Sequence, residues 1–286
     1  MVVRRLIAPV LALVVLALPG LATAQTQTTA QTRTLPLWEL GVAVGAGYTP
    51  DYPAADEYST RILPLPYFVY RGRVFRSEES GLLRGRVFYN DRIDFDISMA
   101  GAVDVKSADN EARAGMPDLD WMGQIGPRVQ VRLAQAARDA HIDFELPIRA
   151  VLGTDFARFR HIGFMSVPEI AYQHDNLAGT GVHLKLGAGA TFADKKFQDE
   201  IYGVDPQFAT ADRPAYEAKG GYMGSRLQLS SYYALNERFR VFGLLRGDFH
   251  QGAANEESPL FRSKTSGTVI TGFTFLFARS RATVVE

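Results

Sequence analysis

The chain has 286 residues, and its 31 basic and 31 acidic side chains leave no net formal charge. A nucleic-acid partner or a polyanionic substrate would call for a basic surplus, so the composition argues against both. No cysteine is present, which excludes disulfides, thiolate metal sites, a cysteine nucleophile and the acylated cysteine of a mature lipoprotein.

Residues 1–24 have the features of a cleavable signal peptide. Two arginines near the start are followed by an apolar run over 6–18, which a Pro-Gly pair ends. Small residues then occupy the positions that a signal peptidase reads before a cut after Ala24. We predict export from the cytoplasm and a flexible, polar lead over residues 25–36.

Beyond the lead, apolar and polar residues alternate with the period of two that is typical of half-buried β-strands. In IDFDISM at 93–99, the apolar residues point to one face, and Asp94 and Asp96 point to the other. The same period recurs in IDFELPIRA at 142–150. We predict about twelve strands, with ten as an alternative because the third and fourth are short. The predicted strands cover 38–48, 61–70, 73–76, 82–89, 93–105, 121–133, 141–154, 161–172, 181–192, 222–234, 238–249 and 267–277.

The connections between these strands are either long loops or tight turns. Long loops span 49–60, 106–120, 193–221 and 251–266. If the first strand runs upward, all four fall at one end of the molecule and the tight turns fall at the other. This sorting is typical of outer-membrane barrels, whereas a soluble β-sandwich has no reason for it. We therefore predict an all-β fold, a transmembrane antiparallel up-and-down β-barrel over 37–277, surrounded by outer-membrane lipids and lipopolysaccharide.

The polar faces of the strands predict which charged side chains line the barrel interior. The candidate lumen-facing charges are Asp94, Asp96, Arg128, Arg132, Asp143, Glu145, Arg149, His183 and Lys185. Acids and bases on neighbouring strands can pair, or they can simply face a water-filled interior, and the pattern leaves both open. In either case, charges inside a barrel of this size leave at most a narrow channel.

The longest loop contains YGVDPQFATADRPAYEAKGGY at 202–222, whose polar and turn-forming residues resemble those of an active site. Prolines fix backbone angles, aspartates can cap tight turns, and a glycine pair lets the chain re-enter the barrel. We interpret the segment as a structured extracellular lid. Its candidate residues are Tyr202, Asp205, Pro206, Asp212, Arg213, Pro214 and Tyr216. We expect Arg213 to pair with Asp212 or another loop acid; the alternative is that it folds inward as a constriction.

Several segments resemble the MipA/OmpV family in order along the chain. They are the opening segment, YPAADEY at 52–58, LPLPYFVYRG at 63–72, LLRGRVF at 82–88 and ARAGMPDLDW at 112–121. The resemblance runs from about residue 38 to 277 and implies an outer-membrane β-barrel of a Gram-negative bacterium. The family's namesake interacts with a lytic transglycosylase and is thought to scaffold murein synthases and hydrolases. Other members are described as porin-like or as surface antigens.

The end of the chain departs from the usual barrel pattern. Outer-membrane barrels usually finish on an aromatic residue that the insertion machinery reads, and Phe277 would be that residue here. Nine further residues follow it, at 278–286. Either the insertion signal need not be terminal, or these residues form a tail in the periplasm; we expect the tail.

Enzyme functions find little support in the residues. The five histidines are His141, His161, His174, His183 and His250, and none lies in a GxSxG context. The acidic loop at 106–120 lacks the spacing of a calcium loop. We predict no enzyme activity, no metal and no cofactor. The favoured function is a scaffold that docks murein enzymes through the short turns and the tail. A narrow porin-like channel is the alternative, and a lipid-modifying enzyme of the outer leaflet is a third that no sequence feature supports.

Overall fold

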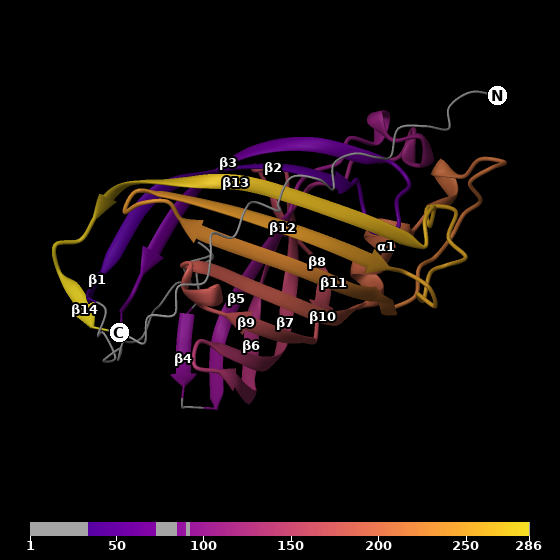
Figure 1. Cartoon of the computed structure of the whole chain (residues 1–286). Coiled ribbons are helices and arrows are strands. Elements are labelled where there is room, and N and C mark those ends of the chain that lie inside the picture. Colours follow the sequence, from indigo (N-terminus) through magenta and orange to yellow (C-terminus); the bar gives the residue numbers. More distant parts are fainter. Residues whose placement is uncertain (1–33, 73–84, 90–91, 286) are drawn as a thin grey trace, which may run out of the picture.

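The structure is a computed structural model that describes residues 34–72, 85–89 and 92–285, and it is built almost wholly from β-strands (Figure 1). Within the described residues there is one α-helix, α1, Lys195–Tyr202. The strands are β1 Thr34–Pro36, β2 Trp38–Pro50, β3 Tyr58–Tyr70, β4 Gly85–Tyr89, β5 Ile93–Ala102, β6 Trp121–Ala137, β7 Ala140–Thr154, β8 Phe159–Ser166, β9 Glu169–His174, β10 Val182–Ala193, β11 Gly221–Ala234, β12 Phe239–Phe249, β13 Thr265–Arg279 and β14 Thr283–Val285. No helix in these described ranges is long and apolar enough to cross a membrane.

Twelve strands form one antiparallel sheet in the order β3-β2-β13-β12-β11-β10-β8-β7-β6-β5-β4, with β9 between β7 and β10. Strands that follow each other in sequence are neighbours in the sheet, and the last long strand, β13, pairs with the first, β2. This pairing is the seam of an up-and-down barrel, so the predicted fold is confirmed. β3 and β4 end the described ladder. The predicted strand at 73–76 lies outside the described residues.

One predicted strand, 161–172, is divided into β8 and β9. Both halves pair with β7 and with β10, so together they occupy one position in the barrel wall. The break falls at Pro168, which has no N–H to donate to the ladder. Its carbonyl still accepts a hydrogen bond from the Ala190 N–H at 3.1 Å, which keeps the wall continuous.

The alternation in the sequence corresponds to an inward and an outward face of the barrel wall. On β7, Ile148 is 53% exposed, whereas Glu145 and Asp143 are buried. Large apolar side chains are exposed on many of the strands, as a wall facing hydrocarbon requires. Those on the outward faces include Ile62, Ile148, Leu186, Leu227, Leu245, Val269 and Phe273.

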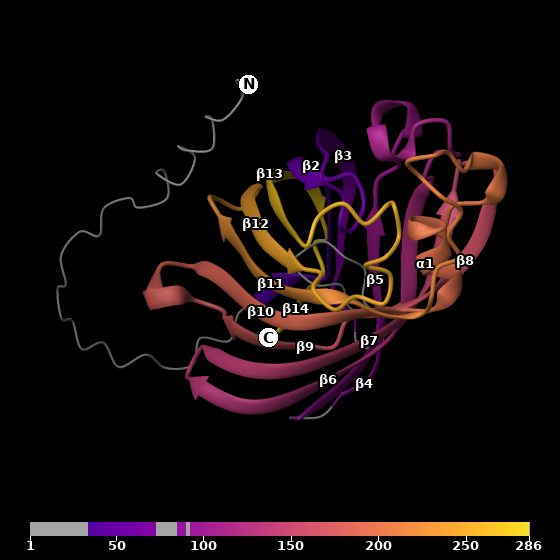
Figure 2. The same cartoon turned by 90° about the vertical axis from the view of Figure 1, so that its right-hand side faces the viewer.

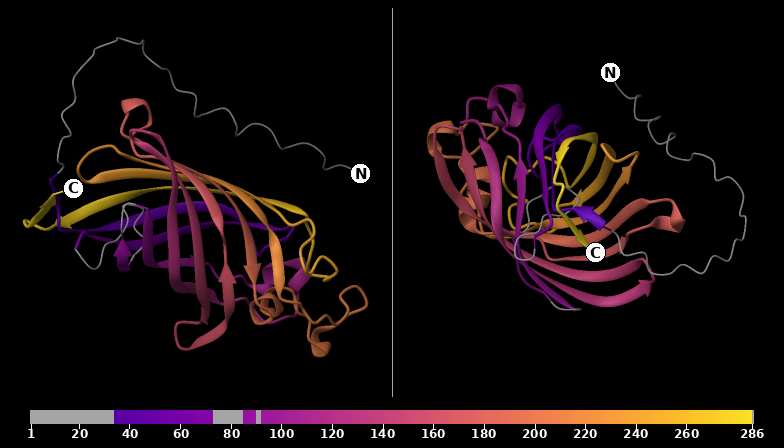
Figure 3. Two further views of the ribbon diagram at one scale, coloured as in Figure 1. Left: turned by 90° about the horizontal axis from the view of Figure 1, so that it is seen from below. Right: turned by 90° about the vertical axis from the view of Figure 1, so that its left-hand side faces the viewer.

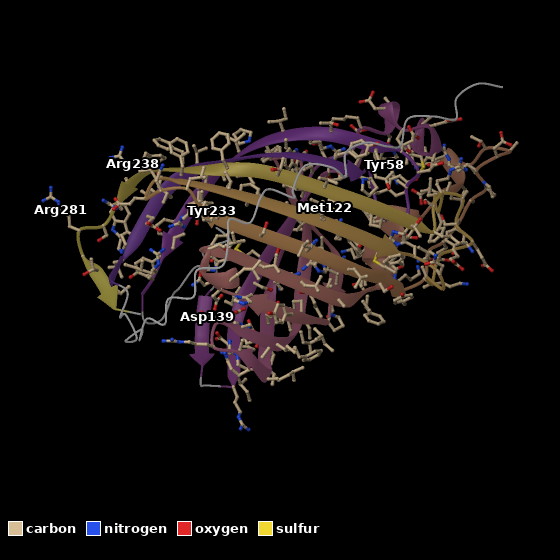
Figure 4. All side chains as sticks on the ribbon, viewed as in Figure 1. Tyr58, Met122, Asp139, Tyr233, Arg238 and Arg281 are labelled. Carbon is tan, nitrogen blue, oxygen red and sulfur yellow. The ribbon has the colours of Figure 1, made fainter. Side chains whose placement is uncertain are left out.

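The loops sort by length as predicted. The four long loops gather with α1 at one end of the strands (Figures 1 and 2). β1 and β14 lie together at the other end, beside the C-terminus (Figure 3). Tyr58 marks the long-loop end, and Arg238 and Arg281 mark the short-turn end (Figure 4).

Thr34–Pro36, within the predicted flexible lead, and the residues after Phe277 are more ordered than we expected. β13 continues past Phe277 to Arg279, with a bulge between Leu276 and Ala278. Phe277 lies on the outward face with Phe273 and is 62% exposed. Thr283–Val285 then pairs with Thr34–Pro36 as a two-stranded sheet. The end of the lead and the end of the tail therefore hold each other, because each supplies the backbone hydrogen-bond partners of the other.

Candidate functional site

The largest buried apolar cluster lies in the four long loops and the strand ends beneath them. These loops cover 51–57, 103–120, 194–220 and 250–264, and we call them the cap. The cluster consists of Tyr52, Ala54, Ala55, Val105, Leu119, Met122, Val151, Ile162, Ala193, Phe197, Ile201, Tyr202, Val204, Ala218, Met223 and Leu260. The inward faces of the described strands are largely polar, and they bury only a smaller apolar cluster of Tyr67, Val69 and Leu276. The loops supply the core instead, and in doing so they cover one end of the barrel.

Helix α1 is the firmest part of the cap. The Asp194 carboxylate accepts a hydrogen bond from the Phe197 N–H at 2.9 Å and so caps the first turn. Phe197, Ile201 and Tyr202 are buried on the face towards the barrel. Gly163 of β8 sits under the helix start at φ +135°, where a Cβ atom would lie 2.3 Å from the Asp194 carboxylate. The close approach of α1 to the wall thus depends on a glycine.

The predicted lid residues are found in the cap, but several make other contacts than expected. Arg213 donates to the carbonyls of Ala112 and Ala114 at 2.9 and 3.0 Å, so it neither pairs with Asp212 nor folds inward. Carbonyl oxygens of a neighbouring loop satisfy its guanidinium and join the two loops. Tyr202 is fully buried, and its neighbour Tyr216 donates to Asn255 at 3.1 Å.

The remaining lid residues, Asp205, Pro206, Asp212 and Pro214, lie in the loop, but the two aspartates do not cap its turns with their side chains. Pro206 starts a short 3₁₀ turn, but the Asp205 side chain caps nothing there. The Arg213 N–H donates to the Thr210 hydroxyl at 3.1 Å. Asp212 and Pro214 are exposed. The expectation that the Asp205 side chain caps a turn is therefore wrong.

Two buried polar residues that the sequence did not single out tie the cap loops together. Arg113 donates to the carbonyls of Ile201 and Pro117, both at 3.2 Å, and lies 5.8 Å over the Tyr52 ring. Asn255 is fully buried and donates to Gln198 and to the Lys219 carbonyl at 2.6 and 2.8 Å. Because the buried side chains of Arg113 and Asn255 form hydrogen bonds between different loops, they hold these loops in one arrangement, and the cap is an ordered part of the fold.

Several of the acidic and basic side chains predicted to line the interior lie there, and they form ion pairs with one another. Arg128 donates to Asp96 at 3.0 Å and to Glu145 at 3.2 Å. Lys185 continues the chain from Glu145 at 2.8 Å to Glu169 at 3.0 Å. Of the two arrangements left open by the sequence, direct pairing across neighbouring strands is the one found. Glu169, on β9, was not among the predicted interior charges.

The other predicted interior charges form a second group nearer the short turns. Asp143 is fully buried and accepts hydrogen bonds from Gln130 at 2.6 Å and Arg132 at 3.2 Å. The His183 ring stacks on Tyr232 with centroids 4.2 Å apart. Asp94 lies half-buried on the same face of β5 as Asp96. Arg149 stands apart, since it donates to the Ser98 hydroxyl at 2.9 Å.

A serine–histidine pair that the sequence spacing did not reveal lies where the last cap loop meets the wall. His250 Nε2 is 3.1 Å from the Ser266 hydroxyl, and Nδ1 is 3.0 Å from the Met223 carbonyl. A carbonyl only accepts, so Nδ1 carries a proton. Both side chains are buried, and the ring also meets Phe261 edge-on. The geometry fits a clamp that holds the cap loop to β11 and β13. Among the described residues, no group of three or more acids and histidines could hold a metal ion.

A family model described as MltA-interacting protein MipA matches residues 42–277. The chain belongs to the MipA family. No curated protein sequence matches it significantly. With the apolar outward faces, membership of the MipA family identifies the chain as an outer-membrane β-barrel protein.

Solved structures similar to this MipA-family barrel are themselves outer-membrane proteins. The NanC porin is 8% identical at a TM-score of 0.40, with 82% of this chain and 98% of that chain covered. A bacterial polysaccharide outer-membrane secretin is 11% identical at a TM-score of 0.40, over 85% of this chain and 99% of that one. Outer-membrane phospholipase A from Escherichia coli is 7% identical at a TM-score of 0.33, over 83% and 92% of the two chains.

We expect acid to loosen the cap of this MipA-family barrel, with Asp118 contributing to the effect. The Ser107 N–H and then the Lys106 ammonium hold the pKa of the Asp118 carboxyl below its ordinary value. The stabilisation is therefore present above the unfolded-state pKa and is lost as pH falls through the lower folded-state pKa. Limited proteolysis of the cap between about pH 5 and 2 measures it. Asp118→Asn should flatten this profile and exposed Asp212→Asn should not; equal profiles for all three proteins would contradict the assignment.

Proposed function

We propose that this protein is a membrane anchor that holds a murein-processing enzyme at the periplasmic side of the outer membrane. The observation that carries the proposal is the match of residues 42–277 to a family described by its interaction with MltA. In this proposal the apolar wall faces outer-membrane lipids and lipopolysaccharide. The outer-membrane insertion machinery places the barrel there after export through the predicted signal peptide.

The filled interior supports an anchor over an open pore. The ion-paired chain from Asp96 to Glu169 crosses neighbouring strands with side chains that are mostly buried. The cap covers the end of the barrel above it and is held by a buried apolar core. Because the ion-paired chain and the cap both obstruct the lumen, a large partner would bind at the ends or rims of the barrel and not inside it.

The short-turn end offers a formed docking element for that partner. β1 and β14 make a separate two-stranded sheet, and each leaves one edge with backbone groups that an extended segment of a partner can pair with. The sheet is held to the barrel by Arg71, whose side chain donates to the Pro36 carbonyl at 2.9 Å and to Glu39 at 2.8 Å. An anchored edge of this kind is suited to a protein partner, and a lytic transglycosylase or a murein synthase is the partner we propose.

Val284→Pro tests the docking element. Val284 pairs with Leu35, and a proline there removes the N–H and disrupts the small sheet. We expect recovery of a lytic transglycosylase with the tagged barrel from membranes to fall at least about tenfold, a loss of about 1.4 kcal/mol. Asp212→Asn in the cap is the matched control and should recover as much as wild type. Heat-modifiable migration on gels checks that both variants form the barrel; wild-type recovery by a folded Val284→Pro protein would refute docking at this sheet.

A further inference from the structure

Three arginines, two of them from the paired strands β11 and β12, converge in the barrel interior. Arg149 lies on β7, Arg226 on β11 and Arg246 on β12. Arg149 interacts electrostatically with Arg226, and Arg226 with Arg246, so their guanidinium groups form one cluster. Like charges gathered in a poorly hydrated interior repel one another unless acids or a bound anion compensate them.

The acids near the cluster leave it in excess of positive charge. Asp248 is shared by two arginines, with Arg246 at 2.8 Å and Arg226 at 3.6 Å. The other acids within reach are already bound, Glu145 and Glu169 by Lys185 and Asp96 by Arg128. Arg149 faces a single neutral partner, the Ser98 hydroxyl.

The hydrogen-bond donors of the cluster are mostly unused. Arg149 donates through Nε alone, Arg226 through one terminal nitrogen to Thr191 at 2.8 Å, and Arg246 through Nε and one terminal nitrogen. Within the part of the chain that the structure describes, both terminal nitrogens of Arg149 and one each of Arg226 and Arg246 therefore lack an acceptor. Arg226 Nε is buried without a hydrogen bond as well. Guanidinium forks of this kind match the oxygens of a carboxylate or phosphate.

The cluster is also reachable from the lumen. The side chains of Arg226 and Arg246 are 19% and 30% exposed, in contrast to the 6% of Arg128 in the ion-paired chain. Both side chains are therefore open to a small solute inside the barrel.

We infer that Arg149, Arg226 and Arg246 form a binding site for a small solute that carries a carboxylate or phosphate group. The site goes beyond the proposed anchoring function and does not depend on it. Bound there, the anion compensates the surplus charge and accepts hydrogen bonds from the unused guanidinium nitrogens. The barrel interior thereby has a ligand of its own, separate from any protein at the periplasmic rim.

Titration calorimetry on the full-length barrel in detergent tests the site, with sodium phosphate, sodium glucuronate and glucose as probes at equal ionic strength. Glucuronate and glucose differ by one carboxylate, and phosphate distinguishes an inorganic oxyanion from an organic acid. We expect saturable binding of phosphate or glucuronate and none of glucose. Arg149→Gln and Arg226→Gln should each weaken binding at least about tenfold.

Arg240→Gln is the matched control, because Arg240 is also an interior arginine but is bound to Glu39 at 3.1 Å and to Tyr67 at 2.9 Å. Its binding should equal that of wild type. The unfolding temperature of the wild-type barrel in phosphate or glucuronate, compared with chloride, gives a second measure that needs no variant, and we expect it to rise. Absence of saturable anion binding by wild type, equal affinity in Arg149→Gln, or an equal loss in Arg240→Gln would each overturn the site.

Discussion

Arg128→Met is expected to destabilise the folded barrel by about 3–5 kcal/mol, the usual cost of removing one member of a buried ion pair. Arg128 is 5% exposed and is held between Asp96 and Glu145, which are themselves 2% and 6% exposed. Methionine keeps the volume and removes the charge, so both carboxylates lose their shared cation. Urea-induced unfolding of the refolded barrel in detergent, followed by gel migration, measures the loss.

Arg132 is the matched control on the same strand. Its side chain is 40% exposed, and its partner Asp143 also accepts hydrogen bonds from Gln130 and Gln173. Arg132→Met should therefore cost clearly less than Arg128→Met, because Arg132 is partly solvated and Asp143 keeps its other hydrogen-bond donors. Neutralising the acids with Asp96→Asn and Glu145→Gln should recover much of the stability of Arg128→Met. Equal losses for Arg128→Met and Arg132→Met, or no recovery, would show that the interior charges do not act as a buried network.

Arg113→Ala is expected to open the cap. Arg113 is 3% exposed and joins two cap loops through the carbonyls of Ile201 and Pro117. Hydrogen bonds to charged groups contribute about 1.5–3 kcal/mol each, so a loss of about 3 kcal/mol raises the open population roughly 100-fold. Protease cleavage of the cap in reconstituted vesicles should accelerate by a similar factor.

Conductance measurements on the same variant distinguish an anchor function from a channel function. We expect wild-type protein in a planar bilayer to give no conductance steps, and Arg113→Ala to give brief ones when the cap opens. Lys195→Ala, which removes only the exposed pair with Glu217, is the control and should behave as wild type in both assays. Steady conductance by the wild-type protein would favour the porin-like alternative, and unchanged cleavage of Arg113→Ala would show that the cap does not depend on this residue.

Much of the architecture could be read from residues in sequence, because the face of a strand is a local property. The alternation around Asp96 and Asp143 placed these acids inside, and both are buried there. The loop lengths likewise predicted that the four long loops lie at the same end of the barrel, since antiparallel strands alternate in direction. The break at Pro168 was missed even though proline is a visible signal, because the residues on either side continue the alternation.

The candidate site was less accessible to sequence reasoning. The positions of the lid residues were anticipated, but Arg213 finds its acceptors at Ala112 and Ala114, about a hundred positions earlier in the chain. Asn255, Arg113 and the pair of His250 with Ser266 carry no local motif. Their roles come from loops that meet only after the barrel has closed.

By itself, the sequence determined most of the strands, their order, the inward or outward face of the side chains in its clearest alternating stretches, and the sorting of the long loops. Each of these depends on neighbours along the chain, on the period of two and on where turn residues fall. Only the tertiary structure decided which charges meet, as with Arg128 and Glu145 at 17 positions apart and Glu145 and Lys185 at 40. It also decided that the long loops pack into a cap and that three arginines share one region of the lumen. Such contacts depend on the register and curvature of the closed sheet, which no local pattern encodes.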